Sequence, residues 1–157
     1  MKEVDVFFEA IRSGDEDKLL GLLNSNPDLV NVKDARGFTP LIFATYFDNE
    51  VATKILLEHN APVDVKDASG NTALIGVSFK GNVNIAKKLI QSGADINAKN
   101  NNGTTPLIFS ATYGKEAIVS LLLELGADKT IKDNHGKSAY DYALEKKFES
   151  TATLLDN

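Results

Sequence analysis

Residues 37–44 read GFTPLIFA, and nearly the same phrase, GTTPLIFS, returns at residues 103–110. A third copy, GNTALIGV, lies halfway between them at residues 70–77, and GKSAYDYA follows at residues 136–143. The four copies begin with glycines that are 33 residues apart, Gly37, Gly70, Gly103 and Gly136. A constant period of this length predicts a stacked array, because each unit is one supersecondary element that cannot bury its apolar face alone.

The residues after each glycine predict the start of a short helix. A Thr or Ser comes two positions later, where its side-chain oxygen can cap a helix, at Thr39, Thr72, Thr105 and Ser138. Pro40 and Pro106 follow at the first helical position, where the missing N–H has no helical partner. About two turns later, Asp48, Gly81 and Gly114 predict the end of the helix, because these residue types tolerate a left-handed backbone.

A second helix is predicted from apolar residues that recur one turn apart and form one buried stripe. In the three central units the stripe consists of Ala52, Thr53, Leu56 and Leu57, then Ile85, Ala86, Leu89 and Ile90, then Ile118, Val119, Leu122 and Leu123. Each stripe ends at a residue typical of a left-handed C-terminal cap, Asn60, Gly93 or Gly126. The segments that follow are rich in Asp, Asn and Gly, which predicts protruding hairpin loops.

The composition is that of a folded, soluble protein of one domain. The chain has 157 residues, of which 43% are apolar and 25% are charged. Its 17 basic and 22 acidic side chains leave a formal charge of −5, which argues against nucleic acid or an anionic membrane as a partner. The absence of cysteine excludes disulfides, zinc–thiolate sites and a catalytic thiol.

The sequence predicts no targeting or membrane segment. Glu3, Asp5 and Glu9 interrupt the apolar residues near the N-terminus, whereas a signal peptide has an uninterrupted apolar run. No stretch approaches the roughly 18 apolar residues that are needed to span a bilayer. We therefore expect a cytoplasmic protein.

The 33-residue period, the phrase G-x-T-P-L, the GAD tripeptides at 93–95 and 126–128, and the double-leucine helix resemble ankyrin repeats. The resemblance covers nearly the whole chain. It implies an all-α solenoid of helix-turn-helix units with β-hairpin loops. The single domain, 1–157, then holds five units with atypical terminal caps, at about 3–36, 37–69, 70–102, 103–135 and 136–157.

The sequence departs from the family pattern in the first helices and at the ends. Where the family usually has a histidine after T-P-L, this chain has Ile42, Ile75 and Ile108, with Asp141 in the last unit. Gly76 stands where neighbouring units have Phe43 and Phe109, which predicts looser packing around the middle unit. Lys18 and Thr151 replace apolar residues of the inner units, which predicts polar ends and therefore a monomer.

No cluster of residues predicts catalysis, a cofactor or a metal site. His59 and His135 are two units apart, too far for ligation of one metal ion. The Gly-Lys-Ser at 136–138 lacks the glycine that a phosphate-binding loop needs five residues earlier, since position 131 is isoleucine. The Asn-Gly-Thr at 102–104 is interpreted as a turn. The carboxylates are spread over the predicted helix surfaces and loops.

A stacked array of this family implies binding of another protein through a concave surface of loop tips and first helices. The predicted contact residues are those that the repeat does not need for folding: Arg36, Phe38, Tyr46, Phe47, Ser69, Asn71, Phe79, Lys80, Asn102, Thr104, Thr112 and Tyr113. Aromatic residues and arginine commonly anchor interfaces, which favours a binding patch on the second and third units. Alternatively, the rings pack on neighbouring helices, with Tyr46 touching Phe79.

Two other functions are compatible with the sequence. The aromatic patch could serve self-association in a structural protein. The groove could also hold a small ligand or a substrate, which would require a deep, enclosed pocket with convergent polar groups.

Overall fold

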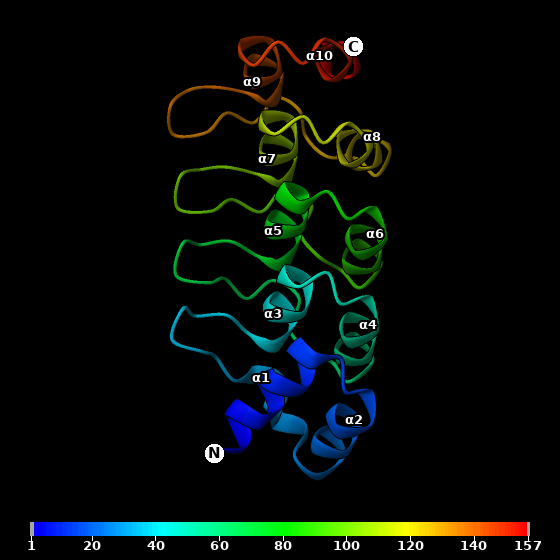
Figure 1. Ribbon diagram of the computed structural model, residues 1–157. Helices are drawn as coiled ribbons and strands as arrows, with labels where there is room; N and C mark the ends of the chain where they lie inside the picture. Colours follow the sequence, from blue (N-terminus) through cyan, green and yellow to red (C-terminus); the bar gives the residue numbers. More distant parts are fainter. Residues whose placement is uncertain (1, 157) are drawn as a thin grey trace.

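Short α-helices stack in two layers in the computed structural model, which describes residues 2–156 (Figure 1). Along this range the elements are α1 (Glu3–Ser13), α2 (Glu16–Ser25), the 3-10 helix η1 (Pro27–Asn31), α3 (Pro40–Tyr46), α4 (Glu50–Glu58), α5 (Ala73–Lys80), α6 (Val83–Gln91), α7 (Pro106–Thr112), α8 (Glu116–Glu124), α9 (Ala139–Glu145) and α10 (Glu149–Asp156). The odd-numbered helices form one layer and the even-numbered helices the other, and the long loops project beside the odd-numbered layer. This is the helical solenoid that the period predicts.

The helix starts and stops follow the local chemistry of the sequence. Thr39 Oγ1 accepts the backbone N–H of Ile42 at 3.2 Å, and the equivalent bonds cap α5, α7 and α9. The first helices of the central units end where Asp48 and Gly81 adopt left-handed backbones, with φ of 54° and 87°. These caps and stops confirm the boundaries that the repeated phrase predicts.

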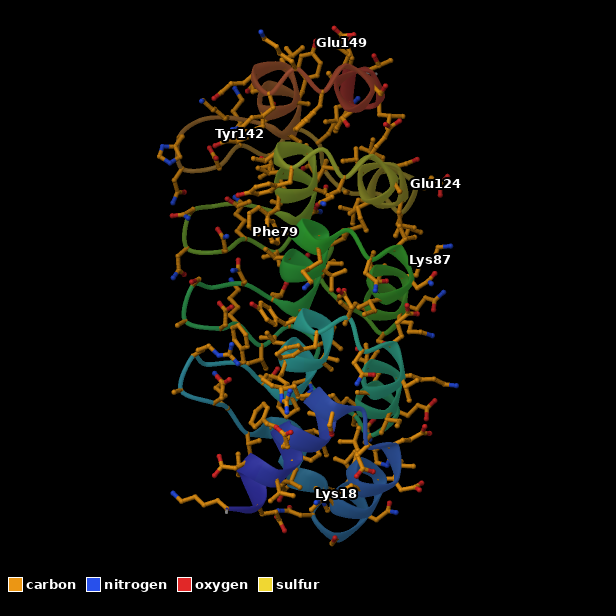
Figure 2. All side chains as sticks on the ribbon, viewed as in Figure 1. Lys18, Phe79, Lys87, Glu124, Tyr142 and Glu149 are labelled. Atoms are coloured by element: carbon orange, nitrogen blue, oxygen red, sulfur yellow. The ribbon has the colours of Figure 1, made fainter. Side chains whose placement is uncertain are left out.

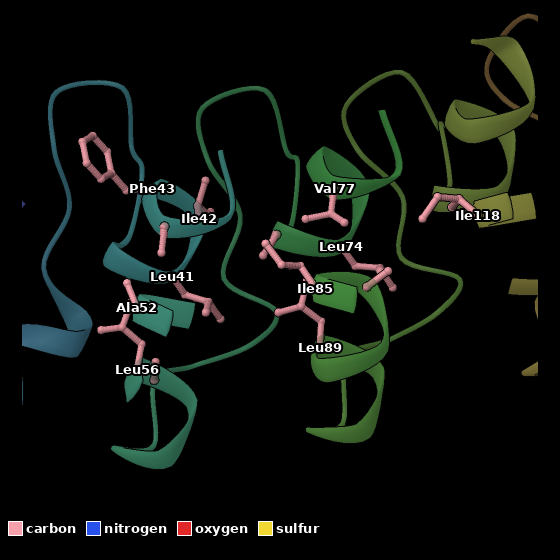
Figure 3. Close-up of a cluster of buried hydrophobic side chains, with 14 of the residues drawn as sticks. Leu41, Ile42, Phe43, Ala52, Leu56, Leu74, Val77, Ile85, Leu89 and Ile118 are labelled. Carbon is pink, nitrogen blue, oxygen red and sulfur yellow. The ribbon is translucent and has the colours of Figure 1, made fainter. Parts of the chain in front are cut away.

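The core lies between consecutive helix pairs (Figure 3). Leu56, Leu89 and Leu122, at the same position of three successive units, are all fully buried. In each predicted stripe the first three residues are buried, and the fourth, as at Leu57, is half-buried. Each unit therefore contributes apolar side chains to a continuous core that its neighbours complete.

The loops are connected from one unit to the next by backbone hydrogen bonds. The N–H of Asn101 donates to the carbonyl of Ser69 at 3.1 Å, and the N–H of Asn134 donates to that of Asn102 at 3.0 Å. Ala68 bonds to Arg36 in the same way, at 3.3 Å. The loops have the shape of hairpins, and residues 2–156 contain a single antiparallel bridge, Lys132–Ser138, in place of regular strands. These bonds between loops occur although the family's usual histidine is absent.

The approach of the loops explains why glycine recurs at the tip. Gly70 has a φ of 80°, which already disfavours any other residue. A Cβ at Gly70 would also lie 2.8 Å from the backbone nitrogen of Asn101 in the next loop. Gly136, with a φ of 76°, has open space at its Cβ position because no described loop follows it.

The ends of the stack differ from the prediction that both are polar. Lys18 on α2 is exposed, but Thr151 on α10 is buried, because α10 packs against α8 and α9. Leu144 and Phe148 are exposed near the same end of the stack. The prediction that Thr151 forms part of a polar, solvent-facing end is therefore wrong. The monomeric state stays a prediction.

The two loop glycines give a matched test of the contact between units. Gly70→Ala combines a strained backbone with a clash, so the free energy of unfolding should fall by about 2–3 kcal/mol. Gly136→Ala has only the backbone strain and should lose about 1 kcal/mol. Urea unfolding of both variants measures the difference, and equal losses would show that the next loop does not restrict Gly70.

Candidate functional site

Aromatic side chains gather on the side of the molecule formed by the loops and the odd-numbered helices, which we call the loop-side surface. The first aromatic cluster consists of Phe8, Phe38, Phe43, Tyr46 and Phe47, whose neighbouring rings have centroids 4.8–5.8 Å apart. The second aromatic cluster consists of Phe79, Phe109 and Tyr113, with centroids 4.7–5.6 Å apart. Distances of this size are typical of favourable edge-to-face and tilted ring pairs.

Four of these rings are packed on one side and open to solvent on the other. Tyr46, Phe47, Phe79 and Tyr113 are 49%, 43%, 42% and 48% exposed. Phe79 packs on Tyr113, and no ring pair joins Tyr46 to Phe79 among residues 2–156. Figure 2 shows Phe79 beside the loops, whereas Lys87 and Glu124 project from the even-numbered helices on the opposite side.

A pocket of about 200 Å³ opens between the two aromatic clusters. Tyr46 lines it from α3, Phe79 from α5 and Phe109 from α7, together with Gly76. Apart from Gly76 itself, its two chain neighbours and the backbone of its own helix, no atom lies within 4 Å of the position where Gly76 would carry a Cβ. The pocket therefore exists because Gly76 replaces a phenylalanine of the repeat, and it confirms the predicted looser packing around the middle unit.

Two cations on the loop-side surface are held by carboxylates and by aromatic rings. The Arg36 guanidinium lies 4.2 Å from the centroid of the Phe38 ring and 2.8 Å from Oδ2 of Asp34. Burial raises the pKa of the Asp34 carboxyl, but the hydrogen bonds from Arg36 and from the N–H of Phe38 outweigh this effect, and the net pKa is lowered. Lys80 Nζ lies 5.0 Å from the Tyr46 ring and 3.6 Å from Oδ2 of Asp48.

The structure leaves eight of the twelve predicted contact residues exposed, namely Arg36, Tyr46, Phe47, Ser69, Phe79, Lys80, Asn102 and Tyr113. The other four are half-buried and serve the fold. Phe38 packs against the core, and Asn71 Oδ1 accepts a bond from Asn100 at 2.9 Å. The N–H of Thr104 donates to Asn100 Oδ1, and the Thr112 hydroxyl donates to the carbonyl of Ile108 at 2.7 Å. These four residues therefore stabilise the fold, although the repeat pattern does not require a particular residue at their positions.

Sequence reasoning missed the pocket residues Gly76, Asp67 and Phe109 as parts of a site. The sequence around Gly76 predicted only loose packing. The pocket itself could not be predicted, because the residues that line it come from three different units. Asp67 looked like an ordinary turn residue, since an Asp or Asn stands at the same place in each inner loop.

The most perturbed titratable group lies away from the pocket, at the last loop. The Tyr142 hydroxyl donates a short hydrogen bond to Oδ2 of Asp133 and ties this loop to α9. Burial and the bond to the carboxylate raise the pKa of Tyr142 to about 12. Burial alone would raise the pKa of Asp133, but the bonds from Tyr142 and from the N–H groups of Lys137 and His135 lower it.

The described residues offer no assembled centre for metal chemistry. Within 2–156, no group of three or more His, Cys, Asp or Glu side chains could hold a metal ion. His59 is half-buried, with Nδ1 2.8 Å from the carbonyl oxygen of Ile55, and His135 is exposed at a loop tip. No helix in this range has the length and apolar character needed to cross a membrane.

Stacked helix pairs with connected loops and an open aromatic face define a helical-repeat protein. A family model described as ankyrin repeats (3 copies) matches residues 7–100 and 75–157. The chain belongs to the ankyrin repeat family. Ankyrin repeats are generally protein–protein interaction modules and are generally not catalytic. A search of curated proteins found no matching sequence.

The bond between Tyr142 and Asp133 predicts a pH-dependent contribution to stability. The pKa of Tyr142 rises from 10.0 to about 12 on folding, so its contribution is complete below pH 10 and is lost as the pH rises through about 12. The folded pKa of Asp133 is lowered, so its contribution is present above its ordinary value of 3.8 and is lost as the pH falls below it. The difference in unfolding free energy between wild type and Tyr142→Phe should therefore be largest between about pH 5 and 9.

Urea unfolding at a series of pH values measures this difference. Tyr140→Phe is the matched control, because Tyr140 lies on the same helix and makes no side-chain hydrogen bond with the described residues. A Tyr142→Phe difference that stays constant up to pH 12 would contradict the assignment.

Proposed function

We propose that this chain is a non-enzymatic interaction domain that binds a partner protein through a concave surface of loop tips and first helices. The domain spans 1–157 and consists of the five units 3–36, 37–69, 70–102, 103–135 and 136–157. The proposal takes the chain to be a monomer in the cytoplasm that binds neither nucleic acid nor membrane. It rests on one observation above all, the exposed and mutually packed rings of Tyr46, Phe47, Phe79 and Tyr113.

Ring packing prepares these side chains for binding. Phe47 lies against Phe43 with centroids 4.8 Å apart, and Phe79 lies against Tyr113 with centroids 4.7 Å apart. A ring that is already held by its neighbours loses little conformational entropy when a partner covers it, so more of the buried apolar area contributes to affinity. Aromatic side chains that a partner buries in this way contribute most of the binding free energy in many interfaces.

The exposed polar residues around the clusters complete the proposed contact surface. Arg36, Ser69 and Asn102 lie at three successive loop tips, and Lys80 ends α5 beside the pocket. They would form the polar rim of the interface, where individual contacts add specificity more than affinity. Phe38, Asn71, Thr104 and Thr112 are half-buried and would support the surface from beneath.

Affinity capture from the native lysate tests the proposal. A double variant, Phe47→Ala with Phe79→Ala, should lose a protein that the wild type retains, because two anchors disappear. The matched control is Val51→Ala with Leu125→Ala, which truncates an exposed apolar side chain on α4 and another at the C-terminal end of α8. The control should retain the partner.

Two measurements on the purified variants make the outcome interpretable. The contacts of the partly exposed rings should contribute little to stability, so the melting temperature of the double variant should fall by only a few degrees. For a chain of this size, each kcal/mol lost from the free energy of unfolding lowers the melting temperature by about 2–4 °C. Light scattering at micromolar concentration should give a monomer. Capture of the same partner by wild type and double variant would refute the proposed surface, and a dimer broken by the double variant would favour self-association.

A further inference from the structure

The inner loops share a turn that is closed by an Asp or Asn side chain. Asp34, Asp67, Asn100 and Asp133 stand at equivalent positions, and Oδ1 of each accepts two backbone N–H groups of its own loop. One atom of each side chain therefore serves the fold, and the second terminal atom is available for another contact.

In three of the four loops the second terminal atom has a partner within the chain. Arg36 donates to Oδ2 of Asp34, Nδ2 of Asn100 donates to Asn71, and the Tyr142 hydroxyl donates to Oδ2 of Asp133. Oδ2 of Asp67 is different, because no residue of the range 2–156 bonds or pairs with it. Asp67 is half-buried, and it lines the pocket over Gly76.

The loop one unit earlier shows one group that satisfies such a carboxylate beside an aromatic ring. Arg36 donates from Nε and Nη2 to Oδ2 of Asp34, at 3.1 and 2.8 Å, while its guanidinium lies 4.2 Å from the Phe38 ring centroid. One unit later, the residues equivalent to Asp34, Arg36 and Phe38 are Asp67, Ser69 and Asn71. The carboxylate is kept, but the arginine that would neutralise it is missing.

The pocket beside Asp67 has the size and lining for the side chain of an arginine. A cavity of about 150 Å³ can hold benzene, so the pocket, at about 200 Å³, accommodates a slightly larger group. Ile42, Tyr46, Phe79 and Phe109 supply apolar and aromatic contacts for an aliphatic stem and a planar guanidinium. A carboxylate next to aromatic rings favours a cation over a neutral occupant.

The charges around the pocket are consistent with a cationic occupant. Lys80 also lines the pocket, but its Nζ lies 3.6 Å from Oδ2 of Asp48 and is paired there. Arg36 is paired with Asp34. The charge without an internal partner is therefore the negative charge of Asp67, in a chain whose formal charge is −5.

We propose that the pocket over Gly76 binds one arginine side chain of the partner protein, with the stem against Tyr46 and Phe79 and the guanidinium on Oδ2 of Asp67. This inference rests on the proposed interaction function and names the chemistry that the surface recognises. Arginine is favoured over lysine because its planar guanidinium stacks on rings and donates two parallel bonds to a carboxylate.

Peptide titration of ¹⁵N-labelled protein tests the site without a known partner. The probe is the capped pentapeptide Gly-Gly-Arg-Gly-Gly, compared with versions in which citrulline or leucine replaces arginine. The arginine peptide should shift the amide signals of Asp67, Gly76 and Phe79, with a Kd of about 1 mM for a single side chain. Citrulline has nearly the same shape without the charge, and its peptide should bind about tenfold more weakly.

Asp67→Asn isolates the carboxylate without removing the turn, because Asn100 closes the equivalent turn in the next loop. This variant should bind the arginine peptide about tenfold more weakly than wild type. Asp28→Asn is the control for net charge, since Asp28 is exposed on η1 and does not line the pocket, and it should leave the affinity unchanged. Gly76→Phe restores the phenylalanine of neighbouring units and should abolish binding by filling the pocket.

Several results would overturn the inference. The first is a leucine peptide that binds the same amides as tightly as the arginine peptide, which would make the pocket a site for neutral apolar side chains. The others are an unchanged arginine affinity in Asp67→Asn, or no localised shifts at about ten times the expected Kd. None of these results concerns partner capture, so the interaction function would stand if Phe47 and Phe79 were still needed for capture.

Discussion

Burial of apolar side chains between consecutive helix pairs is the interaction on which the rest of this structure depends. Leu56, Leu89 and Leu122 are fully buried, although each belongs to a pair of helices only seven to nine residues long. Isolated helices of this length are marginal in water, so they need the stabilisation of about 1.5–3 kcal/mol that burial of one large apolar side chain provides. The neighbours of each unit supply that burial, and the regular spacing of the units then brings the loop tips within hydrogen-bonding distance.

The same constraint leaves the loop-side surface free to vary. Residues that face the neighbouring unit are held by packing, whereas Gly76 stands at the position where the units on either side have Phe43 and Phe109. The stack tolerates the missing ring because Ile75 and Val77 on either side of Gly76 remain buried. The missing side chain at Gly76 thus leaves a surface pocket between the two aromatic clusters, and Asp67 is one of the residues that line this pocket. In this way an array of similar units acquires one distinctive position.

Local features of the fold could be predicted from the sequence, and features that join several units could not. The caps at Thr39 and Ser138 and the left-handed stop at Asp48 depend on a few adjacent residues, so the sequence predicted them correctly. Phe38 and Thr112 were expected to be free, but neighbouring elements bury them partly. Thr151 was assigned to a polar end because its position was read without the packing of α10 on α8. The pocket combines three units, and the sequence showed only the glycine at its centre.

Hydrogen exchange of the loop-tip amides tests the stacking of units most directly, because the chain contains its own control. The N–H groups of Ala68, Asn101 and Asn134 donate to the preceding loop, whereas the equivalent N–H of Ala35 has no acceptor among the described residues. We expect the first three amides to exchange more slowly than that of Ala35, by about tenfold or more after correction for sequence effects. Equal rates at all four positions would contradict a stack in which each unit stabilises the next.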